Sequence, residues 1–296
     1  MSLTDLSTIQ SLLAAHGLRP NRQLGQNFLI ESSVLDHMMA SADIGPDDLV
    51  LEVGPGIGCL TEVLSSRAKA VFACEKDPGM TGILAVTVKS LNNVRVFRGD
   101  VLGTEFRTAF MEWLHKQGKS SAKGESASLG QFKIVSNLPY QITSFFLRTF
   151  LSGDLRPSSM TLLIQKEVAE RIVAGPGDHS LLSLSVQFYG SPSIIVEVPK
   201  TCFYPVPKVD SAVIHIDLGA GYGHDHPDVE PKKMFRLMKC GFSSKRKTLY
   251  NNLSSGLGID KEVLKNKLDR ANLSQFRRAQ ELSWEEWGIL YQALAS

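Results

Sequence analysis

The tetrapeptide Asn137-Leu138-Pro139-Tyr140 combines a side-chain amide, a rigid turn, backbone carbonyls and an aromatic ring. It follows a β-like run at 132–136 and precedes an apolar pattern typical of a helix. Ligands of open α/β sheets bind at the carboxyl ends of the strands, which is where this tetrapeptide falls. We therefore predict that it holds a flat base that carries an exocyclic amine.

A glycine-rich turn follows an earlier apolar strand, with Gly54, Gly56 and Gly58 directly after residues 49–53. Glycines permit positive φ and allow a ligand to approach the backbone closely. The spacing is G-x-G-x-G, whereas dinucleotide-binding turns prefer G-x-G-x-x-G. Alone, the turn is compatible with either a ligand loop or a purely structural turn.

Two carboxylates follow the next two predicted strands. Glu75 ends a strand about 20 residues after the glycines, where an acidic group accepts hydrogen bonds from ribose hydroxyls. Asp100 ends the third strand, where a carboxylate accepts from an adenine amino group. The plainer alternative for Glu75 is a surface carboxylate beside Lys76. For Asp100 it is an N-cap or turn residue. A nicotinamide site would share the glycines and Glu75, but Asp100 and the Asn137 motif favour S-adenosylmethionine.

The elements that position these residues alternate between strand and helix. Strands are predicted at 49–53, 70–74, 94–97, 133–136, 161–164, 194–198 and 211–216, with helical patterns between the first five. This order predicts an α/β fold with a mainly parallel sheet covered on both faces. The last two strands are joined by a proline-containing segment too short for a crossover helix, which predicts a hairpin. The polar stretch 116–130 is predicted to be a flexible surface insertion.

The composition is that of a soluble protein, with 296 residues of which 43% are hydrophobic and 21% are charged. No apolar run approaches the roughly 20 residues that span a bilayer. Residues 1–17 contain no Lys or Arg and resemble neither a secretory signal nor a transit peptide, so we expect a cytoplasmic protein. The four cysteines are scattered, which indicates free thiols in a reducing compartment. The His224-Asp225-His226 run is interpreted as a polar loop, and no metal site is predicted.

Positive charge is concentrated near the C-terminus. Residues 230–280 contain 13 Lys or Arg against four Asp or Glu, whereas the net charge of the whole chain is +2. The Gly-, His- and Pro-containing stretch 219–231 is the best linker candidate. We therefore predict a catalytic domain at 1–218 and a small, basic, all-helical domain at 219–296. The basic domain indicates a polyanionic partner such as nucleic acid.

With these features together, the chain resembles the KsgA/RsmA family of rRNA adenine dimethyltransferases. The resemblance rests on six blocks in the family's order, at 21–29 (NRQLGQNFL), 52–58 (EVGPGIG), 137–140 (NLPY), 165–171 (QKEVAER), 205–213 (PVPKVDSAV) and 242–249 (FSSKRKTL). It implies a Rossmann-like, class I S-adenosylmethionine-dependent methyltransferase sheet. One departure is the stretch 181–186 (LLSLSV), which lacks the Tyr, Gly and Arg common in the family.

The resemblance also implies roles for individual residues. The cofactor contacts would be Asn27, Leu29, Gly54, Gly56, Glu75, Asp100 and Asn137. Tyr140 resembles the residue that stacks on the target adenine, and Phe203 an aromatic on the opposite side of that base. The alternative for Phe203 is a core ring beside a proline turn.

The implied reaction is in-line methyl transfer to adenine N6, twice at each of two adjacent adenines in a loop of small-subunit (16S) rRNA. The Asn137 side chain and the Leu138 carbonyl would accept hydrogen bonds from the amine, Pro139 would fix the turn, and Tyr140 would fix the base plane. The expected partners are small-subunit rRNA and the pre-30S particle, bound by a monomer. Phosphates would be contacted by Arg19, Arg22, Lys208, Lys245, Arg246 and Lys247.

Three alternatives stay open from the sequence. The first is a resistance methyltransferase that acts on large-subunit RNA, although the block at 205–213 favours the KsgA branch. The second is a non-catalytic RNA-binding assembly or transcription factor. The third is a nicotinamide-dependent oxidoreductase.

Overall fold

The computed structural model describes residues 2–21, 24–118 and 131–295, and the chain divides into two compact units. Unit 1 comprises 1–169 and 193–218, and unit 2 comprises 170–192 and 219–296. This division differs from the predicted boundary because residues 170–192 group with the C-terminal residues. The reason is the α8 helix (Leu181–Tyr189), whose Leu184 and Phe188 are buried in the apolar core of unit 2.

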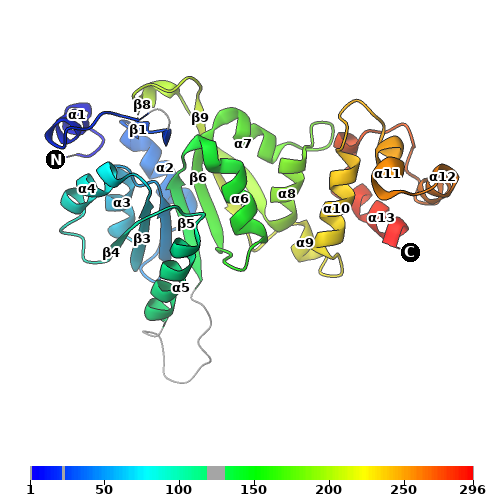
Figure 1. Cartoon of the computed structure of the whole chain (residues 1–296), viewed down its shortest axis with the longest axis horizontal. Coiled ribbons are helices and arrows are strands. Elements are labelled where there is room, and N and C mark those ends of the chain that lie inside the picture. The colour runs from blue at the N-terminus through cyan, green and yellow to red at the C-terminus, as the bar shows by residue number, and fades with distance from the viewer. Residues whose placement is uncertain (1, 22–23, 119–130, 296) are drawn as a thin grey trace. The chain divides into compact units, whose positions relative to one another are not determined.

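Unit 1 is built on a seven-stranded sheet in the order β4-β3-β2-β5-β6-β9-β7 (Figure 1). The first five strands in this order pair in parallel, and β9 pairs with β6 antiparallel. The predicted α/β fold class and its antiparallel addition are confirmed. The strands are β2 (Leu49–Val53), β3 (Ala70–Glu75), β4 (Val94–Arg98), β5 (Phe132–Asn137), β6 (Ser159–Gln165), β7 (Ser191–Val198) and β9 (Ser211–Asp217).

Helices cover both faces of this sheet because side chains alternate along each strand. On one face, Val71 of β3 belongs to an apolar cluster with residues of α2 (Ser32–Ala42) and α3 (Cys59–Ser65). On the other face, the neighbouring Phe72 packs against Phe106 and Phe110 of α5 (Thr104–Gly118). The remaining helices of unit 1 are α1 (Leu6–Ala15), α4 (Pro78–Thr87), α6 (Thr143–Ser152) and the first half of α7 (Lys166–Val173).

The order of the strands creates a switch point between β2 and β5. From β2 the chain moves outward through β3 to β4, and it then returns through α5 to β5 on the other side of β2. The loops that follow β2 and β5 therefore run in opposite directions, which opens a crevice at the carboxyl ends of these strands. The glycine turn and the Asn137–Tyr140 turn are those two loops.

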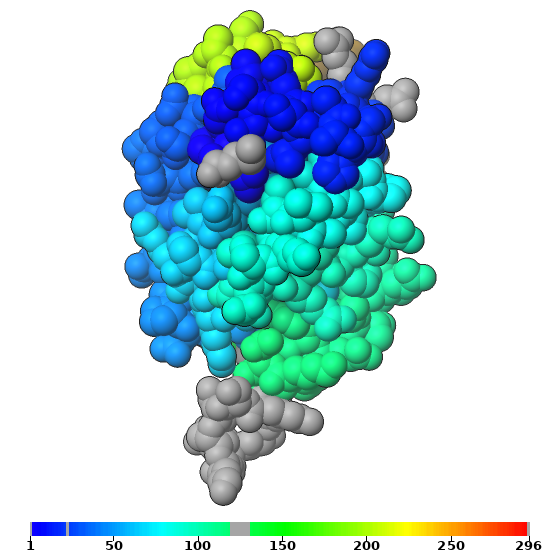
Figure 2. Space-filling view, turned by 90° about the vertical axis from the view of Figure 1, so that its left-hand side faces the viewer, coloured from blue at the N-terminus to red at the C-terminus, as the bar shows by residue number. Residues whose placement is uncertain are grey.

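A second, two-stranded sheet joins the N-terminal segment to the rest of unit 1. β1 (Phe28–Leu29) pairs antiparallel with β8 (Phe203–Tyr204), so that Phe28 lies opposite Tyr204. Figure 2 shows the dark-blue N-terminal segment beside the yellow-green β8 region, above the cyan region that contains α4. This pairing holds residues 24–29 close to the crevice.

Unit 2 is helical apart from the first residues of β7. Its core contains Met238 of α10 and Trp287 of α13, both fully buried. The divergent stretch 181–186 begins α8, which Ser180 caps by accepting a hydrogen bond from Ser183 N. The predicted linker contains the short helix α9, whose Tyr222 stacks on Trp284 at a centroid distance of 4.6 Å. The helices are α9 (Tyr222–Asp225), α10 (Pro231–Gly241), α11 (Leu249–Leu257), α12 (Lys261–Arg270) and α13 (Trp284–Ala295).

Two further sequence predictions concern surface segments. Most of the predicted insertion at 116–130 lies outside the described residues, and residues 116–118 are the helical end of α5. Within the described part of the chain, no helix is both long and apolar enough to cross a membrane.

Candidate active site

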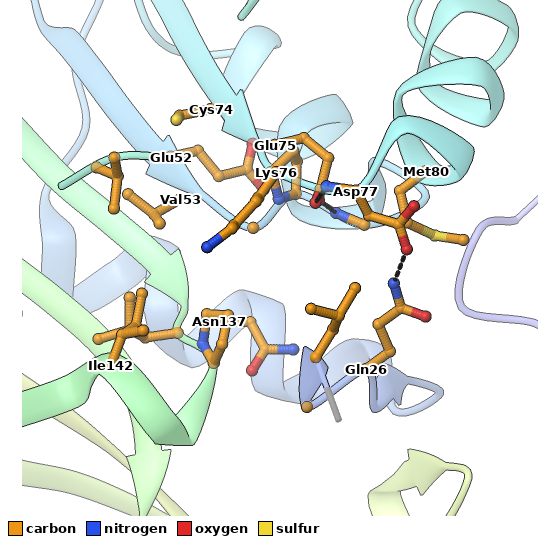
Figure 3. A pocket seen from close by; sticks show the side chains of 18 of the residues that line it. Gln26, Glu52, Val53, Cys74, Glu75, Lys76, Asp77, Met80, Asn137 and Ile142 are labelled. Atoms are coloured by element: carbon orange, nitrogen blue, oxygen red, sulfur yellow. Dashed lines mark hydrogen bonds between the residues drawn. The ribbon is translucent and has the colours of Figure 1, made fainter. Parts of the chain in front are cut away.

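A cavity of about 310 Å³ lies at the carboxyl ends of β2, β3 and β5. This volume is at the lower end of the range for small-molecule sites. Figure 3 shows Glu52, Glu75 and Lys76 on one side of the cavity and Asn137 and Ile142 on the other. All the predicted cofactor and tetrapeptide positions line it, namely Asn27, Leu29, Gly54, Gly56, Glu75, Asp100, Asn137, Leu138, Pro139 and Tyr140.

The glycine turn adopts a conformation that favours glycine. Gly54 has φ +66° and Gly56 has φ +60°. A Cβ atom on Gly54 would lie 3.2 Å from Cδ of Pro139, closer than ordinary van der Waals contact. The turn after β2 and the turn after β5 therefore touch at this glycine, and a larger residue would push them apart.

Glu75 ties the glycine turn to the start of α4. Its Oε2 accepts from Gly56 N at 3.2 Å, and its Oε1 accepts from Asp77 N at 2.8 Å. Burial raises the pKa of Glu75, and these two backbone donors oppose that rise. Glu75 is thus a nearly buried carboxyl group whose oxygens face a cavity, as expected for a group that accepts from ribose hydroxyls.

Asp100 also lines the cavity and pairs with Lys76. Lys76 Nζ lies 2.9 Å from Asp100 Oδ2, and both side chains are largely exposed. This hydrogen bond lowers the pKa of Asp100, so the carboxylate stays an acceptor at neutral pH. From the sequence, Lys76 was considered only as a neighbour of Glu75. In the structure, a base that binds Asp100 would also lie close to the Lys76 ammonium group.

Glu52 is a site residue that the sequence analysis did not select. It lies in the apolar strand β2, is 1% exposed and lines the cavity. Its Oε2 has no hydrogen-bond partner among the described residues. Burial raises the pKa of Glu52 to about 8, and the negative charge of Glu75 acts in the same direction. A carboxyl group inside the run Leu-Val-Leu-Glu-Val was the available signal.

The Asn137–Tyr140 turn is fixed by hydrogen bonds from three neighbouring segments. Ser136 Oγ donates to Val53 O at 2.6 Å, and Leu138 N donates to Leu163 O at 3.1 Å. Asn137 Nδ2 donates to Asn27 O at 3.4 Å. Because the amide nitrogen points toward Asn27, the Asn137 Oδ1 atom is left as an acceptor.

Tyr140 is half-buried and is anchored through its hydroxyl. The hydroxyl shares a hydrogen bond of 2.6 Å with Ser211 Oγ at the start of β9. Burial raises the pKa of Tyr140, so the phenol stays neutral. The ring therefore lines the cavity in a fixed orientation.

Phe203 does not line the cavity, and its predicted contact with the target base stays a prediction. The ring is 1% exposed and belongs to the core beneath β1, and Phe203 is not among the residues that line the cavity. Its backbone pairs with Leu29, which does line the cavity. In this structure Phe203 supports the N-terminal segment as a core residue, which corresponds to the alternative considered for it.

The N-terminal segment is fastened to the cavity by a contact that sequence reasoning missed. Gln26 Nε2 donates to Asp77 Oδ2 at 2.6 Å, and Gln26 Oε1 accepts from Asn21 N at 2.7 Å. Figure 3 shows the Gln26–Asp77 bond at one edge of the cavity. The family block at 21–29 was recognised, but its partner Asp77, the N-cap of α4, is not detectable from spacing.

The predicted phosphate-contacting residues remain predictions. Arg19 and Lys208 are exposed in unit 1, and Lys245, Arg246 and Lys247 are exposed in unit 2. Arg22 lies outside the described residues. No cluster of three or more potential metal ligands is found in the part of the chain that the structure describes.

A family model described as ribosomal RNA adenine dimethylase matches residues 17–289, nearly the whole chain. This chain belongs to the ribosomal RNA adenine dimethylase family. The resemblance seen in the motifs is thereby confirmed, and the oxidoreductase alternative falls away. All the residues that line the cavity fall within the matched range.

Similar proteins named ribosomal RNA small subunit methyltransferase A occur in several bacteria. One from Dehalococcoides mccartyi (strain CBDB1) is 41% identical and covers 95% of this chain and 91% of its own. One from Alkaliphilus metalliredigens is 37% identical, and the match covers 98% of this chain and 97% of the relative. Among ribosomal RNA adenine dimethylases, this chain is thus similar over nearly its full length to small-subunit enzymes.

Solved structures support the same fold. The 23S rRNA methyltransferase ErmE superposes with a TM-score of 0.66 at 23% identity over 91% of this chain and all of its own. A dimethyladenosine transferase from Plasmodium falciparum also has a TM-score of 0.66 at 23% identity. This superposition covers 88% of this chain and 95% of that structure. At this identity the two comparisons bear on the fold alone.

Proposed function

We propose that this chain transfers methyl groups from S-adenosylmethionine to N6 of adenines in small-subunit rRNA, and that it dimethylates two adjacent adenines in a loop. The observation that carries the proposal is the Asn137–Tyr140 turn. It presents two hydrogen-bond acceptors and an anchored aromatic ring beside a cavity lined with carboxyl groups. The relatives named small subunit methyltransferase support the choice of RNA.

The residues of the cavity fit the cofactor. Glu75 and Asp100 are acceptors for ribose hydroxyls and a base amine, and the unpartnered Oε2 of Glu52 suits a hydroxyl or cationic donor. When bound, S-adenosylmethionine supplies an electrophilic methyl group on a positively charged sulfur. The three carboxyl groups would hold the charged and hydroxyl-bearing parts of this molecule, and the Gly54 turn would allow its close approach to the backbone.

The Asn137 turn would orient the target amine. The lone pair of adenine N6 is delocalised into the ring, so the amine is a weak nucleophile in its flat form. Hydrogen bonds from its two protons to Asn137 Oδ1 and Leu138 O would localise the lone pair. No donor among the described residues occupies these acceptors. Tyr140 would hold the base plane, so that orientation supplies much of the rate.

The reaction requires no strong general base in this turn. The nitrogen that gains a methyl group is cationic, and its proton passes readily to water. Because the adenine must be unstacked to enter the cavity, an unpaired loop is the expected target.

The finer assignments follow from the same proposal. The protein acts as a cytoplasmic monomer on a pre-30S particle, with the basic surface of residues 219–296 contacting RNA phosphates. Arg19, Arg22 and Lys208 provide contacts from the catalytic part, and Lys245, Arg246 and Lys247 from the helical part. Phosphate contacts position RNA without reading its sequence.

The decisive experiment measures methyl transfer to purified small-subunit and large-subunit rRNA from cells that lack this gene. We expect N6,N6-dimethyladenosine in the small-subunit RNA by mass spectrometry. Asn137→Ala is expected to lower kcat roughly 100-fold or more, while RNA binding persists. Asn92→Ala, an exposed asparagine after α4, is the matched control. Methyl groups in large-subunit RNA alone would favour the resistance enzyme, and none in either RNA would refute catalysis.

A further inference from the structure

Phe276 is the most exposed large hydrophobic side chain in the described part of the chain, at 77%. It lies in unit 2 between α12 and the short helix η4 (Ala279–Glu281). Phenylalanine is usually buried, because exposing a large apolar ring to water is unfavourable. A ring displayed to this extent therefore calls for an explanation.

The loop that carries Phe276 is anchored. Arg277 N donates to Ser274 O at 3.2 Å, and the Arg277 guanidinium pairs with Glu286 at 2.6 Å. The same guanidinium donates to the carbonyl of Glu281. Because the neighbouring residue is held at both backbone and side chain, the exposed ring is presented by an ordered loop.

The same loop touches the basic turn of the block at 242–249. Leu249 N donates to Arg277 O at 2.8 Å, which joins the two segments directly. The side chain of Asn252 is 2% exposed and holds the turn by donating to Gly241 O at 2.6 Å and Ser244 O at 2.9 Å. The basic turn and the Phe276 loop therefore form one structured surface.

The charges on this surface are unbalanced. Lys245, Arg246 and Lys247 are exposed, and no described carboxylate forms an ion pair with them. The nearby carboxylates Glu281 and Glu286 are instead paired with Arg277. The loop that carries the ring is thus bonded to a turn whose three cations have no ion-pair partner among the described residues, which suits a polyanion better than an apolar protein surface.

We propose that Phe276 stacks on an unpaired RNA base while Lys245, Arg246 and Lys247 contact the adjacent phosphates. An aromatic face among phosphate-binding cations is the arrangement by which proteins hold single strands with little sequence preference. The inference rests on the proposed function only in taking RNA as the ligand. It adds a base contact in unit 2 that is separate from the methylated adenine.

The test compares the affinity of the full-length protein for a 12-nucleotide single-stranded RNA and for a blunt RNA duplex at several salt concentrations. We expect Phe276→Ala to weaken binding to the single strand roughly 5- to 150-fold, the range for a stacked base. The dependence of log Kd on log salt should keep its slope. Lys247→Ala should instead reduce that slope by about 0.7, because it removes one phosphate contact.

Two further variants separate stacking from general apolarity. Phe276→Trp should keep the affinity for single-stranded RNA, whereas Phe276→Leu should lose most of it, because leucine has no π face. Val263→Ala, which trims another half-exposed apolar side chain of unit 2, is the control and should bind as wild type does. Duplex binding should change little in all three variants.

The inference is overturned if Phe276→Ala binds the single strand with unchanged affinity, or if Phe276→Leu binds as well as wild type. It is also overturned if Phe276→Ala abolishes self-association in sedimentation without changing RNA affinity, which would identify a protein contact. The proposed function is tested separately. Wild type that binds RNA through Phe276 but transfers no methyl group refutes the enzyme and leaves the stacking contact standing.

Discussion

The hydrogen bond between Tyr140 and Ser211 joins the predicted base-stacking ring to a residue 71 positions away, with the two oxygens 2.6 Å apart. We predict that Ser211→Ala and Tyr140→Phe each lower kcat/KM for RNA by roughly fivefold, which corresponds to one neutral hydrogen bond of about 1 kcal/mol. The physical reason is that either change frees the ring to turn away from the base plane. The affinity for S-adenosylmethionine should stay as in wild type.

The two variants should differ in stability. Ser211 is fully buried, so Tyr140→Phe leaves its hydroxyl without a partner at a cost of about 1 to 3 kcal/mol. Ser211→Ala leaves the hydroxyl of Tyr140 without this partner, and because Tyr140 is only half-buried the cost should be smaller, about 1 kcal/mol or less. Denaturant unfolding of both variants measures this order.

The double variant Tyr140→Phe/Ser211→Ala decides whether the two side chains act through one bond. If they do, its kcat/KM equals that of either single variant, because the bond can be lost only once. Steady-state methyl transfer to small-subunit RNA gives the three values, with labelled methyl groups counted on the RNA. Multiplied effects in the double variant, or a matching loss of cofactor affinity, would refute the positioning role of Ser211.

Three other predictions follow from the same structure. Gly54→Ala should weaken binding of S-adenosylmethionine in calorimetry, because a Cβ at φ +66° is strained by about 1 to 2 kcal/mol and meets Pro139, whereas Gly82→Ala has open space and should not. Burial raises the pKa of Glu52 from 4.5 to about 8, so the folded state keeps a proton that the unfolded chain releases. The free energy of unfolding should therefore fall as pH rises from about 4.5 to about 8, and Glu52→Gln should reduce that slope in denaturant titrations. Asn252→Ala leaves two backbone carbonyls without their donor and should lower the free energy of unfolding by about 2 to 3 kcal/mol in thermal or denaturant unfolding.

The strands and their carboxyl ends were predictable from the sequence because the signal is local. All five residues of β2 are buried, and the apolar run that marks them coincides with the strand. Glu75 and Asp100 were found by the same logic, since Glu75 is the last residue of β3 and Asp100 lies two residues after β4. The burial of Phe203 could not be predicted, because it goes with the β1–β8 pairing, which involves two residues in each strand and carries no periodic signal.

Contacts between distant side chains were beyond sequence reasoning, and they give the site its rigidity. The Gln26–Asp77 bond links residues 51 positions apart, and neither spacing nor composition indicates it. The Lys76–Asp100 ion pair was likewise not predictable, because it depends on the directions of two side chains that follow the ends of neighbouring strands. Such contacts form between residues that are distant in the sequence and close in the fold. They can therefore be identified only from the folded structure.

The proposed chemistry depends most on the direction in which the Asn137 side-chain amide points. Its nitrogen donates to Asn27 O, so under the proposed function its oxygen is the atom left to accept a hydrogen bond from the target amine. A flipped amide would present two donors to that amine and repel it. The Asn27 carbonyl therefore fixes the amide orientation that the proposed function requires. Gln26 and the β1–β8 pairing hold this segment in place, so under the proposed function they would position the Asn137 amide without touching the base.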